Sequence, residues 1–256
     1  MSAGRPIAGD FLSLLADHSI PPISARMTEG APAQTQGTTV FAFAFSEGVM
    51  IVGDRRATAG NVIVTDTVDK VIELDSSSVL AIAGVPATAF EMARVLQTSF
   101  EYYRRSQLQA LSLAAKVRAL ARLLRDNVPM TVQGLGIVVP IFAGVDRHGE
   151  NPGPKIFFYD ALGAQFQAVD FAASGSGSMT IRSVLRFQEK HGETKPSRMT
   201  RAEAGRFALR LLMTAAELDS ATGGVNPATR SFATIRVLTD GGIEAVDDEA
   251  QAAWMA

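Results

Sequence analysis

Three residues of this sequence could together make a nucleophile with its own base: Thr38, Asp54 and Lys70. A threonine hydroxyl reacts well only when a base removes its proton. If the peptide bond between Gly37 and Thr38 were cut, Thr38 would carry a free α-amine with a pKa of about 7.7 to 8, which suits that task. A nearby Lys70 cation would lower the pKa of this amine, and Asp54 would keep Lys70 charged and oriented. The trio predicts a hydrolase in which one residue supplies both nucleophile and base.

Each charged member of the trio also has a simpler explanation. The segment DTVDKVIEL, residues 66–74, resembles a strand whose side chains alternate between two faces, and Lys70 stands in its apolar row. The residues that share its face are Val68, Ile72 and Leu74. A buried ammonium is costly unless it is paired, so Lys70 could instead extend to solvent at the end of the strand. Asp54 could equally be a turn residue that follows an apolar strand.

The first 37 residues differ in composition from the rest. They are rich in Pro, Ala, Gly, Ser and Thr, with one short apolar patch at residues 11–15. We interpret residues 1–37 as a leader, removed on maturation, that blocks the amine of Thr38 as an amide. Gly37 would let the backbone bend so that Thr38 attacks its own preceding peptide. Residues 38–256 would then form the catalytic domain, although composition alone favours an ordinary flexible N-terminus.

Composition excludes several other classes of protein. The 256 residues carry a net charge of −2, with acidic and basic residues interleaved, so no basic surface for nucleic acid is expected. No apolar run reaches the roughly 18 residues of a membrane span. Cysteine is absent and the three histidines are scattered, which disfavours a metal site. We expect a cytoplasmic protein that needs no metal or other cofactor.

The remaining pattern predicts strands, a helix pair, strands, a second helix pair and final strands. The expected strands are residues 38–45, 48–54, 66–74, 77–84, 134–146, 155–163, 165–175 and a closing hairpin within 231–246. The expected helices are residues 86–105, 112–127, 178–190 and 200–218. Strands joined by hairpins and helices that come in pairs indicate an α+β fold, a four-layer αββα sandwich of two antiparallel sheets between helix pairs.

In this order the motifs resemble the proteasome β-subunits, which are N-terminal-nucleophile threonine peptidases. The resemblance covers residues 38–246, and Asp54 and Lys70 lie 16 and 32 residues after Thr38, as in that family. The motifs are Gly37-Thr38-Thr39, GDRRATAGN at 53–61, Lys70, AIAG ending at Gly84, GSGS at 175–178 and DSATGG at 219–224. The sequences of these motifs are most similar to those of the actinobacterial β-subunits. The resemblance implies the N-terminal-nucleophile hydrolase fold and self-cleavage between Gly37 and Thr38.

The resemblance also implies a role for each site residue. Thr38 would be the nucleophile, Lys70 and Asp54 would tune it, and the Gly84 N–H would stabilise the oxyanion. Ser176 would lie near the Thr38 amine, with Asp219 and Thr222 in support; many relatives have serine at the last position. The implied substrate-binding residues are Ala57, Thr58, Val68, Ile72, Ile82 and Pro86.

The implied partners are those of a proteasome core. β-Subunits of this type form seven-membered rings, two of which stack between rings of α-subunits, and a ring-shaped ATPase feeds unfolded proteins into the chamber. A small protein modifier attached to lysines would be the expected tag in the actinobacterial case. No nucleic acid and no membrane are expected as partners.

Three other functions stay open from the sequence. The chain could be a structural ring subunit without activity, a self-processing threonine hydrolase of small amides, or a subunit of the simpler two-ring bacterial protease. The stretch GSGSMT at 175–180 could also suggest a phosphate-binding turn, but Thr180 stands where the last glycine of that pattern belongs. Trp254 could be either a contact residue or part of a frayed end.

Overall fold

A computed structural model describes residues 37–60, 62–168, 170–229 and 231–255 of the protein. The predicted leader up to residue 36, with its apolar patch at 11–15, lies outside the described residues. The boundary between leader and catalytic domain therefore stays a prediction.

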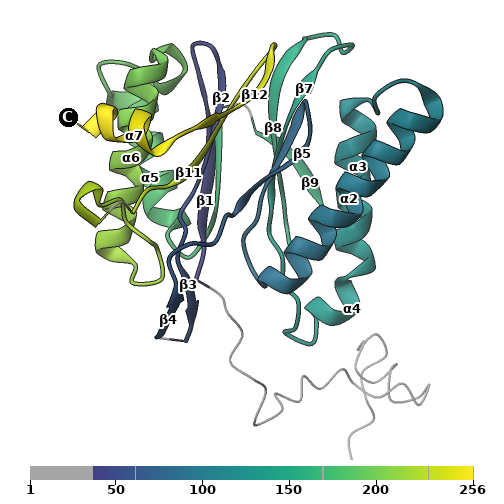
Figure 1. The fold of residues 1–256 in the computed structure, drawn as a ribbon, viewed down its shortest axis with the longest axis horizontal. Coiled ribbons are helices and arrows are strands. Elements are labelled where there is room, and N and C mark those ends of the chain that lie inside the picture. Colours follow the sequence, from purple (N-terminus) through teal and green to yellow (C-terminus); the bar gives the residue numbers. More distant parts are fainter. Residues whose placement is uncertain (1–36, 61, 169, 230, 256) are drawn as a thin grey trace, which may run out of the picture. The chain divides into compact units, whose positions relative to one another are not determined.

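Two five-stranded antiparallel sheets face each other in the folded part of the chain (Figure 1). The first has the order β10 (Phe171–Gly175), β1 (Thr39–Phe45), β2 (Gly48–Gly53), β11 (Thr234–Thr239) and β12 (Gly242–Val246). The second has the order β5 (Val71–Asp75), β6 (Ser78–Ala81), β7 (Ile141–Asp146), β8 (Gly153–Tyr159) and β9 (Gln165–Ala168). A two-stranded ribbon, β3 (Ala57–Ala59) with β4 (Val62–Thr65), follows β2.

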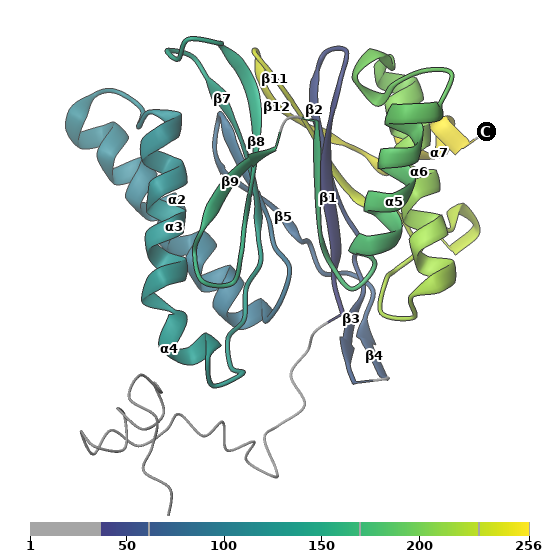
Figure 2. The ribbon, with the colours of Figure 1, turned by 180° about the vertical axis from the view of Figure 1, so that it is seen from behind.

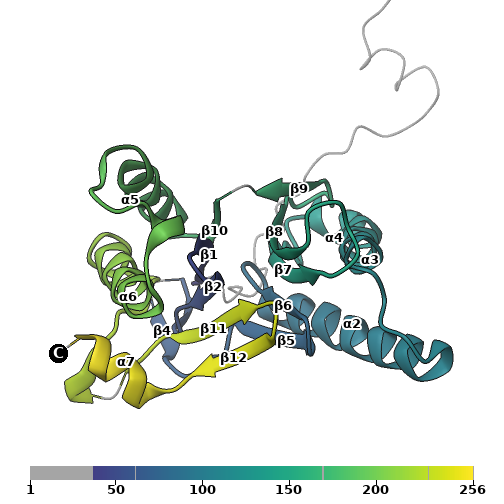
Figure 3. The ribbon, with the colours of Figure 1, turned by 90° about the horizontal axis from the view of Figure 1, so that it is seen from above.

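Helices cover the outer face of each sheet. Against the first sheet lie α5 (Ser178–His191), α6 (Arg201–Leu218) and α7 (Asp248–Met255), and against the second lie α2 (Pro86–Gln107) and α3 (Leu113–Asp126) (Figures 1 and 2). Short helical turns occur at α4 (Val128–Thr131), Pro196–Arg198 and Pro227–Thr229. Seen from above, the order is helices, sheet, sheet, helices (Figure 3). The predicted four-layer sandwich is confirmed.

Three apolar cores separate the four layers. One lies between the first sheet and α5 and α6, a second between the other sheet and α2 and α3, and a third between the two sheets. Strand β1 contributes to two of them: Phe41 and Phe43 face the helices, whereas Val40 and Ala42 face the second sheet. Because both faces of β1 are buried, its sequence is an unbroken apolar run rather than an alternating one.

Residues 165–175, which we predicted as one strand, are two strands in different sheets. Ala168 of β9 pairs with Ile156 in the second sheet, while Phe171 of β10 pairs with Phe43 in the first. The chain therefore crosses from one sheet to the other between these strands (Figure 3). The expectation was wrong because the apolar pattern continues through the crossing, although the sheet that buries it changes.

The predicted strand 66–74 was also wrong in its extent. The strand starts only at Val71, whose N–H donates to the Asp69 carboxylate. Lys70 and Val71 are both buried, so the expected alternation does not run through Lys70.

The predicted strand 134–146 was also too long, because only residues 141–146 form β7, although Val138 makes an isolated bridge with Gly84. The sequence did not predict β3, β4, α4 and α7.

Trp254 is a packing residue on α7 and not part of a frayed end. It packs against the core between the first sheet and its helices, and its ring covers Gly205 of α6. A Cβ atom added at Gly205 would come within 2.3 Å of the Trp254 ring. Glycine at this position therefore allows α7 to lie directly on α6.

We predict that Gly205→Ala lowers the free energy of unfolding by about 1–3 kcal/mol, because the added methyl overpacks the contact with Trp254. Denaturant unfolding of the purified chain measures this change. In a Trp254→Ala background the same substitution should cost less than about 0.5 kcal/mol. An equal cost in both backgrounds would mean that the ring is not what excludes the methyl group.

Candidate active site

Thr38 lies immediately before β1 with its hydroxyl directed back along the chain. It is 3% exposed, and its Oγ1 donates a hydrogen bond of 2.7 Å to the carbonyl oxygen of Gly37. Its own carbonyl oxygen accepts a hydrogen bond of 2.9 Å from the Ser176 N–H and one of 3.3 Å from the Ser176 hydroxyl. The loop after β10 thereby fixes the backbone at Thr38, and the Thr38 hydroxyl is hydrogen-bonded to the peptide that precedes it.

The Lys70 side chain is buried and has three acceptors around its Nζ. They are the Gly37 carbonyl at 3.0 Å, Asp54 Oδ1 at 2.7 Å and the Arg56 carbonyl. A neutral amine has only two N–H groups, whereas an ammonium has three. The three acceptors therefore match a protonated Lys70 that has no lone pair left to act as a base on Thr38.

Asp54 is the counterion of Lys70 and is 1% exposed. Its Oδ1 also accepts from the Thr39 N–H at 2.7 Å. Its Oδ2 accepts from the N–H groups of Arg56 at 3.0 Å and Gly223 at 2.9 Å. Four donors meet on one carboxylate, three of them from distant parts of the chain, so Asp54 joins the start of β1, the end of β2 and the loop after α6 to Lys70.

Burial shifts both members of this ion pair toward their neutral forms. It raises the pKa of the Asp54 carboxyl, although Lys70 and the backbone donors act in the opposite direction. Burial likewise lowers the pKa of the Lys70 ammonium, and Asp54 opposes that change. The geometry favours the charged pair, because each group has hydrogen-bond partners that the neutral form could not fully use.

A second chain of hydrogen bonds supports the same backbone from the other side. The Thr222 hydroxyl donates to Asp219 Oδ2 at 2.6 Å, so the Thr39 hydroxyl must donate to Thr222 Oγ1, also at 2.6 Å. Thr39 Oγ1 in turn accepts from the Gly177 N–H at 3.0 Å. Burial raises the pKa of the Asp219 carboxyl, but side-chain and backbone hydrogen bonds, among them those from the Thr222 hydroxyl and the Ala221 N–H, outweigh it and lower that pKa. Asp219 therefore stays an ionised acceptor for this chain.

Gly84 has a backbone conformation that only glycine adopts easily. Its φ is +114°, and a Cβ atom there would lie 2.0 Å from the Ile137 carbonyl oxygen. The bridge that it forms with Val138 uses the N–H groups of Val85 and Val139, so it leaves the Gly84 N–H unused. This N–H is available as a donor to a ligand.

The structure separates the predicted substrate-binding residues by exposure. Ala57 and Thr58 are buried on β3, and Ile82 is buried in the core beneath α2. The other three, Val68, Ile72 and Pro86, are half-buried. Pro86 is the first residue of α2 and has no N–H to give, as expected. A shared apolar pocket for five of them, all except Thr58, stays a prediction, as does a backbone contact between the segment around Thr58 and the substrate.

Sequence reasoning missed three contributors to the site. The Arg56 carbonyl accepts the third hydrogen bond of Lys70 Nζ, and the Gly223 N–H donates to Asp54. Thr39 links the two hydrogen-bond chains, because its N–H donates to Asp54 and its hydroxyl donates to Thr222. Two of these are backbone groups, which carry no signal in residue type. Thr39 was visible as the second threonine of the Gly-Thr-Thr motif, but its role depends on Thr222, which is 183 residues away.

The described residues contain no cluster of three or more His, Cys, Asp or Glu residues able to hold a metal ion. No helix in the same part of the chain is long and apolar enough to cross a membrane. The candidate site is the constellation around Thr38, where a buried ion pair and a threonine hydroxyl meet at the Gly37 carbonyl.

We predict that Asp54→Ala lowers the free energy of unfolding of the uncut chain by about 3–5 kcal/mol, because Lys70 would remain buried without its counterion. Denaturant unfolding in a Thr38→Ala background measures the effect in a single covalent form. The control is Asp66→Ala, which removes an exposed ion pair with Arg56 and should cost at most about 1 kcal/mol. Equal small costs would show that the buried pair does not hold the site together.

The chain is similar to known proteins over most of its length. A family model described as "Proteasome subunit" matches residues 34–226. The proteasome subunit beta of Acidothermus cellulolyticus is 36% identical over 243 residues, which cover 94% of this chain and 81% of the relative. That of Streptomyces griseus is 35% identical over 246 residues, with 94% and 83% covered. That of Acidimicrobium ferrooxidans is 38% identical over 212 residues, with 83% and 74% covered. Because the family model matches residues 34–226 and these relatives, at least 35% identical, are covered over 74–83% of their own length, the chain belongs to the proteasome β-subunit family.

Proposed function

We propose that the chain is the precursor of a threonine endopeptidase that exposes its nucleophile by self-cleavage between Gly37 and Thr38. The observation that carries the proposal is the double hydrogen bond to the Gly37 carbonyl oxygen, from Thr38 Oγ1 at 2.7 Å and from Lys70 Nζ at 3.0 Å. The hydroxyl lies beside the bond to be cut, and a cation lies where negative charge would develop. A subunit without activity would have no need of this arrangement.

The first step would be attack of Thr38 Oγ1 on the Gly37 carbonyl carbon. The new C–O bond makes a tetrahedral intermediate, whose negative oxygen faces the Lys70 ammonium. When the C–N bond breaks, the hydroxyl proton is transferred to the departing nitrogen, and Gly37 is held as an ester on Thr38. Water then hydrolyses this ester, which releases the leader with a Gly37 carboxylate and leaves Thr38 with a free amine.

The same side chains would serve the mature enzyme. The freed amine of Thr38 would take the proton of its own hydroxyl, and the Lys70 charge would keep the pKa of that amine low. The unused Gly84 N–H would donate to the oxyanion of the substrate. Ser176, Asp219 and Thr222 would hold the backbone of Thr38 and Thr39 in position through the hydrogen bonds described above.

The family also suggests the setting in which this chemistry takes place. We propose that the chain assembles with further β-subunits into seven-membered rings and with α-subunits, and that it degrades unfolded proteins delivered by a ring-shaped ATPase in the cytoplasm. Modifier-tagged proteins are the proposed substrates. An apolar pocket formed by Ala57, Val68, Ile72, Ile82 and Pro86 would receive the side chain before the cut bond.

We predict that the purified, assembled protein starts at Thr38, whereas Thr38→Ala keeps its leader. The reason is that alanine lacks the hydroxyl that attacks the Gly37 carbonyl. Intact mass and N-terminal sequencing distinguish the two forms. Thr38→Ser, which keeps a hydroxyl, should still be cut. A fully processed Thr38→Ala chain in the absence of another protease would show that the cleavage is not autocatalytic.

Cleavage should be far faster after Leu, Phe or Tyr than after Arg or Glu, because a charged side chain in an apolar pocket loses its hydration without gaining a partner. A panel of fluorogenic peptides on the purified particle measures these rates. A dominant cut after Arg or Glu would contradict the pocket assignment.

Pro86→Ala should tighten binding of extended peptides by up to about tenfold, because it restores an N–H to a segment that would pair with the substrate backbone. The measurement is KM for a long and a short peptide that share the same cut bond. Only the long peptide should respond. An unchanged KM for both would mean that this backbone position does not contact the substrate.

A further inference from the structure

Two adjoining cavities run along β10 away from the candidate nucleophile. One, of about 390 Å³, lies between Gly84 and Val85 on one wall and Ala173 and Gly175 on the other. The second, of about 460 Å³, continues from Ala173. Because Ala173 and Arg182 line both cavities, they form one groove, which we call the β10 groove.

The near end of the β10 groove reaches the reacting groups. Gly84 carries the unused N–H, and Gly175 packs so closely on Thr38 that a Cβ atom there would lie 1.9 Å from the Thr38 carbonyl oxygen. The groove thus begins at both the proposed oxyanion donor and the backbone of the nucleophile.

The bond between Gly37 and Thr38 indicates which part of a substrate would enter this groove. On the acyl side, Gly37 lies against Thr58 and the Ala221 carbonyl, since a Cβ atom on it would come within 2.3 Å of Thr58 Oγ1. On the side of the departing amine, the Thr38 carbonyl lies against Gly175 and Ser176. A protein substrate cut by Thr38 would likewise extend its departing segment toward Gly175, where the β10 groove starts.

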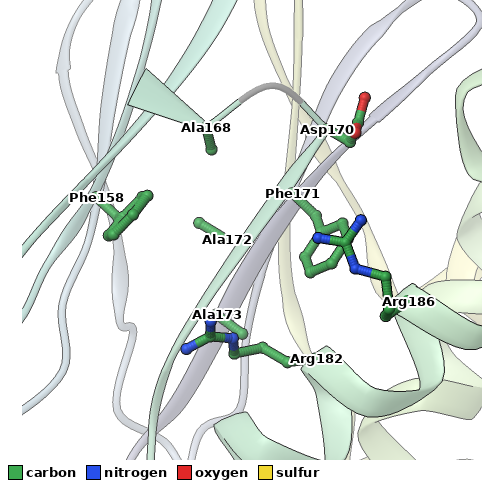
Figure 4. A pocket seen from close by; sticks show the side chains of 8 residues that line it. All are labelled: Phe158, Ala168, Asp170, Phe171, Ala172, Ala173, Arg182 and Arg186. Atoms are coloured by element: carbon green, nitrogen blue, oxygen red, sulfur yellow. The ribbon is translucent and has the colours of Figure 1, made fainter. Parts of the chain in front are cut away.

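The charge of the groove is positive. Arg182 and Arg186, one helical turn apart on α5, both line it and are exposed (Figure 4). Arg186 lies over the Phe171 ring at 5.0 Å, and Figure 4 shows the Arg182 guanidinium beside Ala173. Within the described part of the chain Arg182 has no ion-pair or hydrogen-bond partner. One carboxylate, Asp170, lines the far cavity, so two cations face a single anion there.

The rest of the lining suits a peptide main chain with apolar side chains. The far cavity is lined by Phe158, Ala168, Phe171 and Ala172 in addition to the charged residues (Figure 4). Ser174 lines the near cavity, but its hydroxyl donates to the Val139 carbonyl at 2.6 Å and is therefore already used. Ser178 adds a hydroxyl to the near cavity, but Arg182 is the charged residue that lines both cavities, and its guanidinium binds carboxylates through its planar fork.

We propose that the β10 groove binds the departing segment of a protein substrate and that Arg182 selects acidic side chains in it, a role that rests on the peptidase function proposed above. The side chain before the cut would be chosen by the apolar pocket, and the segment after it by charge. Arg186, farther from Gly175 and stacked on Phe171, would extend the preference to acidic residues further along the segment.

The test is a set of internally quenched peptides that share a Leu residue before the cut and carry one Glu or its matched Gln at each of the first four positions after it. In the wild-type particle, kcat/KM should be about threefold to tenfold higher for Glu than for Gln at one of these positions at low salt. Arg182→Gln should bring that ratio to about one, and Arg182→Glu should favour Lys over Gln at the same position.

The matched control is Lys190→Gln, which removes an exposed cation from the same helix two turns beyond Arg182. It should leave the Glu-to-Gln ratio unchanged.

If all peptides are cut but no position prefers Glu, or if Arg182→Gln keeps the preference, the role of Arg182 is wrong while the peptidase function stands. If no peptide is cut by the processed particle, the peptidase function itself fails. A changed particle size for Arg182→Gln with an unchanged ratio would identify the groove as a contact between copies of the chain, and would also overturn the proposal.

Discussion

The site depends on one buried ion pair, between Lys70 and Asp54. Two charges taken out of water are stable only if their remaining hydrogen-bonding capacity is met. Here it is met by groups from separate segments: the Gly37 and Arg56 carbonyls on Lys70, and the Thr39 and Gly223 N–H groups among those on Asp54. The charges can therefore be buried only when these segments have come together. The same requirement places a cation on the carbonyl that Thr38 would attack, so the geometry that satisfies the ion pair also prepares the reaction.

The sandwich explains why those segments meet at one end of the sheets. Strand β1 is buried on both faces, so the residues before it emerge from the end of the layered core rather than from an open surface. The end of β2, which carries Asp54, lies beside the start of β1, because Val40 pairs with Gly53. The start of β5 brings Lys70 from the facing sheet, and the end of β10 brings Ser176. Thr38, the proposed nucleophile, is thus held between two sheets by backbone hydrogen bonds, which have little freedom to move.

Much of this could be predicted from the sequence, and the failures have physical causes. Helix pairs and hairpins have local signals, so the four layers were correctly predicted. The spacing of Asp54 and Lys70 was informative because a buried charge in an apolar segment demands a partner. The crossing between β9 and β10 was missed because burial in either sheet requires the same apolar residues, so the sequence pattern does not indicate which sheet a strand joins. The Arg56 carbonyl and the Gly223 N–H were missed because backbone groups have no residue type.

The proposed self-cleavage depends on the charge of Lys70 acting on the Gly37 carbonyl. The most direct measurement is the rate of leader release by Lys70→Met, followed by intact mass after the variant has been shown to fold and assemble. Methionine keeps an unbranched apolar stem that is one atom shorter than lysine and removes the ammonium. If the cation stabilises the negative oxygen of the intermediate, release should slow by about a hundredfold or more. Release at the wild-type rate would contradict the account, because Lys70 would then serve only to neutralise Asp54.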